Sequence, residues 1–168
     1  MHKFLVPFRI HSTGCFLIGS CLLMGVWLRG WELGSAMGAL LVASLLMHEI
    51  GHMLTAMALG VPVREFGLRL GGAYNRRAYA TNRRDEVLIS LAGPLTNLLM
   101  AGPLYYIPVI GTQLALGNLA LCVVNLLPIP SSDGLHILQT LRNPGMPADI
   151  ALVPALSQQG PALEKRAA

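Results

Sequence analysis

The chain has 168 residues, of which 54% are hydrophobic and only 12% are charged, and its net charge at pH 7 is +4. A soluble globular domain carries about 25% charged residues, so the composition excludes an ordinary soluble domain and indicates an integral membrane protein. The basic residues are gathered between apolar segments, a distribution that suits lipid headgroups and argues against a nucleic-acid partner.

Four apolar segments approach the length of about 20 residues that a membrane helix needs. They are predicted at about residues 14–28, 33–59, 87–110 and 112–127. The first is short and is flanked by Trp27 and Trp31, which are typical of a membrane interface. The fourth is interrupted by Pro128 and Pro130, so we expect irregular chain at membrane depth after it. The sequence therefore predicts an all-α membrane protein of about four transmembrane helices, with residues 1–142 as one polytopic core.

The loop between the second and third predicted spans contains one strand signal. In "EFGLRLGG" the apolar residues Phe66, Leu68 and Leu70 alternate with Gly67 and Arg69, the period of a strand. This pattern predicts a small membrane-associated β-hairpin between the two spans. We expect the strand at 66–70 to hold an unwound peptide by edge pairing.

The loop charges predict the orientation of the chain in the membrane. One side carries the basic residues Lys3, Arg9, Arg64, Arg69, Arg76, Arg77, Arg83, Arg84, Arg142, Lys165 and Arg166. The other side carries only Arg29. Because basic loops stay in the cytoplasm, both termini and the arginine-rich loop are predicted to be cytoplasmic. Residues 143–168 contain four prolines and are predicted to form a cytoplasmic tail rather than another span.

The second predicted span carries "MHEIGHML" at residues 47–54. Residues four apart on a helix lie about 40° apart around its axis, so His48 and His52 share one face, and Glu49 points about 100° away. This is the H-E-x-x-H arrangement of zinc hydrolases, in which the glutamate is the general base. The alternative, a hydrogen-bonded pair of core histidines, is disfavoured because ionisable groups are costly inside a bilayer.

A catalytic zinc ion needs a third protein ligand and an open position. Two further ionisable residues, Asp133 and His136, are predicted at membrane depth, both in "NLLPIPSSDGLHIL". Asp133 is the better candidate because Gly134 permits a sharp turn that would aim the carboxylate inward. The alternative for Asp133 is an N-cap of a helix that starts near Leu135. His136 is expected to support a ligand or to pack at a helix contact.

Three motifs, "HEIGH", "AGPLTN" and "NLLPIPSSDG", occur in an order that resembles the site-2 proteases, the zinc intramembrane peptidases of family M50. The resemblance implies one Zn²⁺ per chain, with His48, His52 and Asp133 as ligands and Glu49 as catalytic base. It also implies that Asn97 lies near the active site. There its amide could donate to the oxyanion, or it could pack between helices. The length leaves no room for the PDZ or CBS domains of many relatives, so a minimal form is expected.

The resemblance implies an endopeptidase that cuts membrane-spanning or membrane-tethered proteins, in regulated intramembrane proteolysis. We expect it in a prokaryotic cell (inner) membrane. Two other classes stay open: a membrane metal-binding or transport protein, and an inactive scaffold, against which the retained Glu49 argues. A transporter would need further ionisable residues along its spans. Because His48 is predicted roughly 16 Å from the cytoplasmic boundary, we expect a polar channel from that side.

Overall fold

The computed structural model describes residues 6–69 and 72–142, so the predicted tail at 143–168 lies outside the described residues. Its elements are β1 (Phe8–Ile10), α1 (Ser12–Arg29), α2 (Trp31–Ala58), β2 (Val63–Arg69), β3 (Gly72–Arg77), α3 (Arg83–Tyr105), α4 (Gly111–Leu126) and α5 (Asp133–Arg142). Within these residues, α1, α2 and α3 are long and apolar enough to cross a membrane, and α4 is a shorter apolar helix. The prediction of a helical membrane protein with a small sheet between the second and third helices is confirmed.

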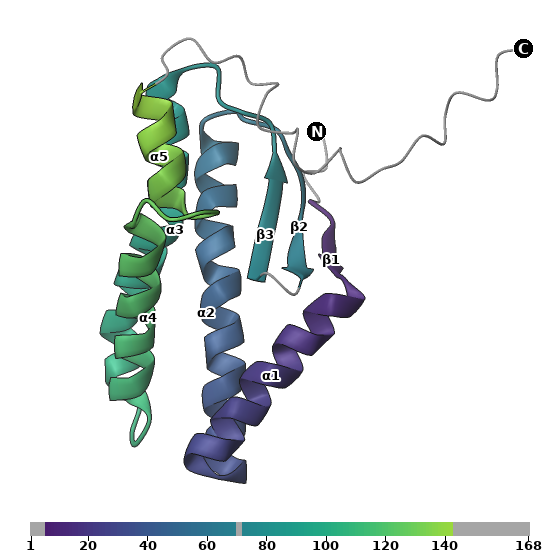
Figure 1. Ribbon diagram of the computed structural model, residues 1–168, viewed down its shortest axis with the longest axis vertical. Coiled ribbons are helices and arrows are strands. Elements are labelled where there is room, and N and C mark those ends of the chain that lie inside the picture. Colours follow the sequence, from purple (N-terminus) through teal and green to yellow (C-terminus); the bar gives the residue numbers. More distant parts are fainter. Residues whose placement is uncertain (1–5, 70–71, 143–168) are drawn as a thin grey trace, which may run out of the picture.

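Helices α1 and α2 form a close antiparallel pair (Figure 1). Gly30 joins them with a φ of 76°, a left-handed conformation that glycine adopts without strain. A side chain at Gly38 would place its Cβ 2.6 Å from the carbonyl oxygen of Cys21, so the two backbones touch where glycines replace side chains. The predicted interfacial residues Trp27 and Trp31 lie at this turn and are 83% and 77% exposed.

Helix α3 begins four residues earlier than the hydropathy pattern predicts and ends five residues earlier than the predicted boundary at 110. Its N-cap is Asn82, whose Oδ1 accepts a hydrogen bond of 2.8 Å from the backbone N–H of Asp85. The helix end precedes Pro108, which lies in the turn before α4. The early start brings the buried Glu86 into the first turn of the helix.

The predicted hairpin is present, but it belongs to a three-stranded sheet in the order β1-β2-β3. β2 pairs antiparallel with β3, and on its other side it pairs parallel with β1, with Phe8 opposite Phe66. Gly67 permits this because any Cβ there would collide with the backbone of Arg9. The expectation that the strand at 66–70 pairs with a substrate is therefore wrong, since both edges of β2 are occupied. Within the described residues, β3 is the strand with an open edge toward the helices.

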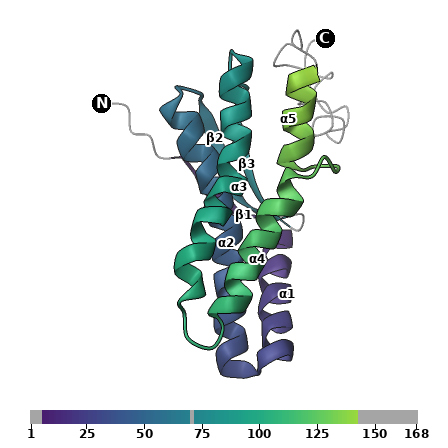
Figure 2. The same cartoon turned by 90° about the vertical axis from the view of Figure 1, so that its left-hand side faces the viewer.

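Helix α2 is the central element, with the sheet on one side and α3, α4 and α5 on the other (Figure 1); Figure 2 shows these three helices from their own side. Two apolar clusters pack against α2, one around Met37 and Leu114 and the other around Ala56 and Ile89. Along α2, the residues between Met37 and Ala56 include the predicted metal-binding motif. The polar site is therefore enclosed between two apolar clusters.

Candidate metal centre

His48 and His52 lie one turn apart on α2, and both are 7% exposed. Their Nε2 atoms are 3.1 Å apart, so the two imidazole edges meet at one point, as the spacing of four residues predicts. A hydrogen bond at Nδ1, on the other edge of each ring, fixes its orientation. Nδ1 of His48 lies 2.5 Å from Oδ1 of Asn97 on α3, and Nδ1 of His52 lies 2.7 Å from the carbonyl oxygen of Ile89.

These partners determine which nitrogen carries the hydrogen. An amide or carbonyl oxygen only accepts hydrogen bonds, so both Nδ1 atoms donate. In a neutral imidazole the other nitrogen, Nε2, then presents a lone pair. Both histidines therefore direct a metal-binding lone pair at the same point.

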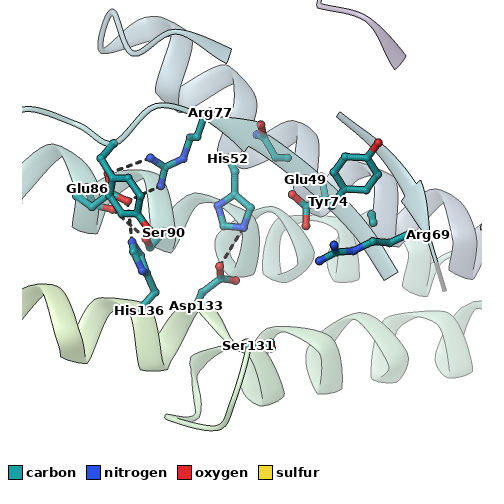
Figure 3. Close-up of a pocket in the computed structure, with 13 residues that line it drawn as sticks. Glu49, His52, Arg69, Tyr74, Arg77, Glu86, Ser90, Ser131, Asp133 and His136 are labelled. Carbon is teal, nitrogen blue, oxygen red and sulfur yellow. Dashed lines mark hydrogen bonds and ion pairs between the residues drawn. The ribbon is translucent and has the colours of Figure 1, made fainter. Parts of the chain in front are cut away.

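Asp133 reaches this point from the start of α5. Its Oδ2 lies 3.2 Å from Nε2 of His48, and its Oδ1 lies 3.2 Å from Nε2 of His52. The alternative N-cap role belongs instead to Ser132, whose Oγ accepts a 3.1 Å hydrogen bond from the N–H of Leu135. The Asp133 carboxylate is thus not used in capping and faces both histidines; Figure 3 shows it directed at His52.

The expected reason for Gly134 is corrected by the structure. The left-handed residue of this turn is Ser131, with φ 67°, whereas Gly134 is not left-handed. A Cβ at Gly134 would lie 2.8 Å from the carbonyl oxygen of Leu127 and closer to that of Leu126. Gly134 is therefore needed because the start of α5 packs directly on the end of α4.

The three donor groups fit a zinc ion. Two imidazole lone pairs and a carboxylate face one another at about 3 Å. Oδ2 of Asp133 is buried and accepts no hydrogen bond, although buried carboxylate oxygens normally have a partner. A bound metal ion would satisfy these facing acceptors together. Two ligands about 2.0–2.1 Å from a tetrahedral zinc ion stand about 3.3 Å apart, close to the spacing of these atoms.

Gly93 of α3 lies directly against this group. A Cβ at this position would be 2.7 Å from Nε2 of His48 and closer still to Nε2 of His52. The absence of a side chain lets the α3 backbone approach the imidazole edges. Sequence reasoning missed this role, although Gly93 belongs to the quoted "AGPLTN".

Glu49 lies beside the histidines without sharing their face. Its carboxylate and one donor atom of each histidine lie within 4.8 Å of one another. Glu49 also lines a cavity of about 300 Å³ together with His52 and Asp133 (Figure 3). The lining of this cavity also includes Arg69 and Tyr74 of the sheet.

At the far side of the same cavity, Glu86 joins three parts of the chain (Figure 3). Its carboxylate accepts hydrogen bonds from both Nη atoms of Arg77, at 2.6 and 2.9 Å, and from the N–H of Ala80 at 2.8 Å. Nε2 of His136 donates to Oε1 of Glu86 at 2.7 Å. His136 therefore links α5 to α3 and does not face the metal centre. Nearby, burial and the Glu86 carboxylate raise the pKa of Tyr79, so its phenol is neutral at pH 7.

The remaining predicted site residue, Asn97, is fully buried. Its Oδ1 accepts from His48, and its Nδ2 donates to Oδ1 of Asn118 at 3.0 Å. Asn118 is uncharged, so the expectation of ionisable residues at membrane depth does not include it. The signal that could have found it is an amide near the middle of α4, a predicted membrane segment that also carries Gln113 and Asn125.

Comparisons with known proteins agree with this site. Residues 36–113 match the model of Peptidase family M50. The chain is 30% identical over 125 residues to sll0528 of Synechocystis sp., covering 66% of this chain and 32% of that protein. It is 27% identical over 152 residues to YwhC of Bacillus subtilis, covering 64% of this chain and 69% of that protein. Both relatives are named as zinc metalloproteases. The fold is similar to that of the Site-2 Protease from Methanocaldococcus jannaschii, with a TM-score of 0.67, 24% identity and coverage of 85% of this chain and 70% of that one.

The fold and the site define a helical membrane protein with a candidate H-E-x-x-H metal centre. Together with these similarities, they make the chain similar to peptidase family M50, whose model matches residues 36–113, and to relatives named as zinc metalloproteases. The chain spans about a third of the length of sll0528 and 69% of YwhC. The family match ends at residue 113, so the place of Asp133 in the site rests on the structure.

Proposed function

We propose that the chain is a zinc-dependent intramembrane endopeptidase that hydrolyses peptide bonds of membrane-spanning or membrane-tethered proteins. The observation that carries this proposal is the meeting of His48, His52 and Asp133 at one point, with Glu49 beside them, between apolar helices. We propose that this peptide hydrolysis serves regulated intramembrane proteolysis.

Nε2 of His48, Nε2 of His52 and the Asp133 carboxylate would hold one Zn²⁺ per chain. When bound, the ion supplies Lewis acidity, which acidifies a water molecule and polarises a carbonyl group. The hydrogen bonds to Asn97 and Ile89 fix the two rings in the orientation that binding requires.

Glu49 is the proposed general base. Its carboxylate lines the cavity where substrate and water would meet, and it does not share the histidine face. It accepts a proton from the attacking water and delivers it to the nitrogen of the leaving amine. Asn97 has a different role from the oxyanion donor that the resemblance suggests. Because both ends of its carboxamide are engaged with protein groups, we assign it to holding His48.

The substrate must present an extended backbone, since a helix hides its carbonyl groups in its own hydrogen bonds. β3 is suited to receive it, because Ala73 and Asn75 of this strand line the cavity. An extended segment added to the open edge of β3 would lie next to Glu49. The positive charges of the loops support an orientation with both termini in the cytoplasm of a prokaryotic cell.

The test uses the full chain reconstituted in liposomes with a membrane-tethered reporter. Glu49→Gln preserves the shape of the side chain but removes the base, so cleavage should fall by about 10²–10⁴-fold while zinc content stays at the wild-type level. Glu32→Gln, the same change at an exposed position of α2, is the matched control and should cut normally. Cleavage by Glu49→Gln at a rate close to the wild type would refute the protease assignment.

A further inference from the structure

A chain of buried hydrogen bonds leads away from the metal centre and returns to the helix on which it began. It runs from His48 on α2 to Asn97 on α3, then to Asn118 on α4 and back to Ser44 on α2. Asn97 and Asn118 are fully buried and Ser44 is 1% exposed. Ser44 precedes His48 by one helical turn, so this series of hydrogen bonds returns to the face of α2 that carries the ligand His48.

The hydrogen bonds at Ser44, the last member of this series of hydrogen bonds, determine the direction of all the others. The Ser44 hydroxyl donates to the carbonyl oxygen of Leu40 at 2.9 Å, so its oxygen is left to accept from Nδ2 of Asn118 at 3.0 Å. The same Nδ2 donates to the carbonyl oxygen of Leu114 at 3.0 Å. The Asn118 amide therefore cannot be reversed, because its oxygen would then face a carbonyl oxygen that offers no hydrogen.

The fixed Asn118 determines the orientation of Asn97 in turn. Oδ1 of Asn118 must receive a donor, and Nδ2 of Asn97 supplies it at 3.0 Å. Reversing Asn97 would place two oxygens 3.0 Å apart in a buried site, where unsatisfied polar groups are costly. Oδ1 of Asn97 is thus held toward Nδ1 of His48, which must carry the hydrogen.

We propose that Asn118 and Ser44 are positioning residues for the metal centre. Acting through Asn97, they fix the ring orientation of His48 and the nitrogen that presents its lone pair to the ion. This inference rests on the proposed zinc site, but it does not depend on which substrate is cut. Neither residue lies in the H-E-x-x-H motif or in the segment that carries Asp133. Helix α2 contributes His48 and Ser44 to this hydrogen-bonded series, and α3 and α4 contribute Asn97 and Asn118.

A purely structural role, in which the two asparagines only join helices, makes a different prediction for one pair of variants. Asn118→Leu keeps the volume but removes donor and acceptor. Asn118→Asp in its protonated form keeps one donor and one acceptor, so it can still receive Nδ2 of Asn97. If Asn118 serves packing alone, leucine is the better substitute in this apolar setting. If Asn118 orients Asn97, the acid is the better substitute.

The measurement is the zinc affinity of the purified full chain, by competition with a chelator of known affinity. Asn118→Leu should bind zinc about 10–100-fold more weakly than the wild type, the usual effect of losing a group that orients a ligand. Asn118→Asp should remain within about threefold. The visible absorption of the cobalt(II)-loaded chain reports ligand geometry directly and should change for Asn118→Leu only. Zinc affinity of Asn118→Leu equal to or above that of Asn118→Asp would overturn the role of Asn118.

Ser44 has its own matched control. Thr96 of α3 donates to the carbonyl oxygen of Ala92 at 2.8 Å, the same type of hydroxyl bond one turn back, but it takes no part in the chain. Ser44→Ala should weaken zinc binding several-fold, whereas Thr96→Val should not change it. Equal affinities for these two variants would remove Ser44 from the proposal. Zinc affinity and the cobalt spectrum are measured without substrate. They therefore test the positioning roles of Asn118 and Ser44 even if Glu49→Gln shows that the chain is no protease.

Discussion

Glu86 of α3 and His136 of α5 are joined by a 2.7 Å hydrogen bond one helical turn from Asp133. Glu86 is also bound by Arg77 at the end of β3, so one buried carboxylate connects α5 to α3 and to the sheet. The helix that brings Asp133 to the histidines is therefore anchored at a second point. This second contact ties the helix, which has only ten residues, to α3 and to the sheet.

Removing this anchor should loosen the metal centre without removing a ligand. His136→Ala is expected to reduce zinc affinity by about tenfold, because Asp133 is then held by α5 packing alone. His136→Gln retains a donor and should recover part of the loss. Gln139→Ala, at an exposed position of the same helix, serves as the control. Chelator competition on the purified chain measures all three variants, and wild-type affinity in His136→Ala would contradict the anchoring role.

Loss of the Asp133 carboxylate should remove the third ligand. We expect Asp133→Ala to retain only a small part of the zinc of the wild type after dialysis, measured as metal per chain, because two histidines alone bind zinc weakly. Glu32→Ala on α2 is the control for loss of a carboxylate far from the site. If Asp133→Ala keeps its metal, Glu49 becomes the candidate third ligand, since it is the other carboxylate beside the histidines.

Adding a methyl group at Gly93 should displace both imidazoles. Overpacking in a filled site costs about 1–3 kcal/mol; if this cost falls on the metal-bound state, zinc affinity of Gly93→Ala should fall by about 5–160-fold. Gly102 lies on the same helix, and a Cβ there meets nothing within 4 Å. Gly102→Ala should therefore bind zinc normally and be slightly more stable, as expected for alanine in a helix. Equal zinc affinity in the two variants would contradict the close approach of α3 to the histidines.

The predicted orientation can be tested with single cysteines in a chain from which Cys15, Cys21 and Cys122 have been replaced by serine. Thr81→Cys lies in an exposed part of the arginine-rich loop, and Glu32→Cys lies near the turn between α1 and α2. A membrane-impermeant thiol reagent should label Glu32→Cys in intact cells and Thr81→Cys only after the cells are opened. The reverse pattern would invert the topology.

The parts of this molecule that the sequence predicted well depend on local spacing. His48 and His52 meet because residues four apart on any helix share a face. Asp133 was identifiable because few ionisable groups are expected at membrane depth. Both inferences needed only the periodicity of a helix and the cost of burying charge.

The parts that were missed depend on contacts between distant segments. β1 pairs with β2 across two intervening helices, and a three-residue strand carries too short a pattern to be recognised. Asn118 reaches Ser44 across 74 positions of the sequence, and nothing in the sequence distinguishes it from the other amides of α4, Gln113 and Asn125, or indicates its partner. α3 begins before its apolar segment because the cap at Asn82, rather than the onset of hydropathy, sets its first residue.

The pairing of β1 with β2 also constrains how the chain is threaded through the bilayer. Main-chain hydrogen bonds cannot extend across a hydrocarbon layer about 30 Å thick, so Ile10 and Leu68 must emerge on the same side. The segment between them therefore crosses an even number of times, whichever way the protein is inserted. The basic residues before α1 and those of the arginine-rich loop then act together on the insertion machinery. Moving one group of charges alone cannot reverse the orientation without breaking the sheet.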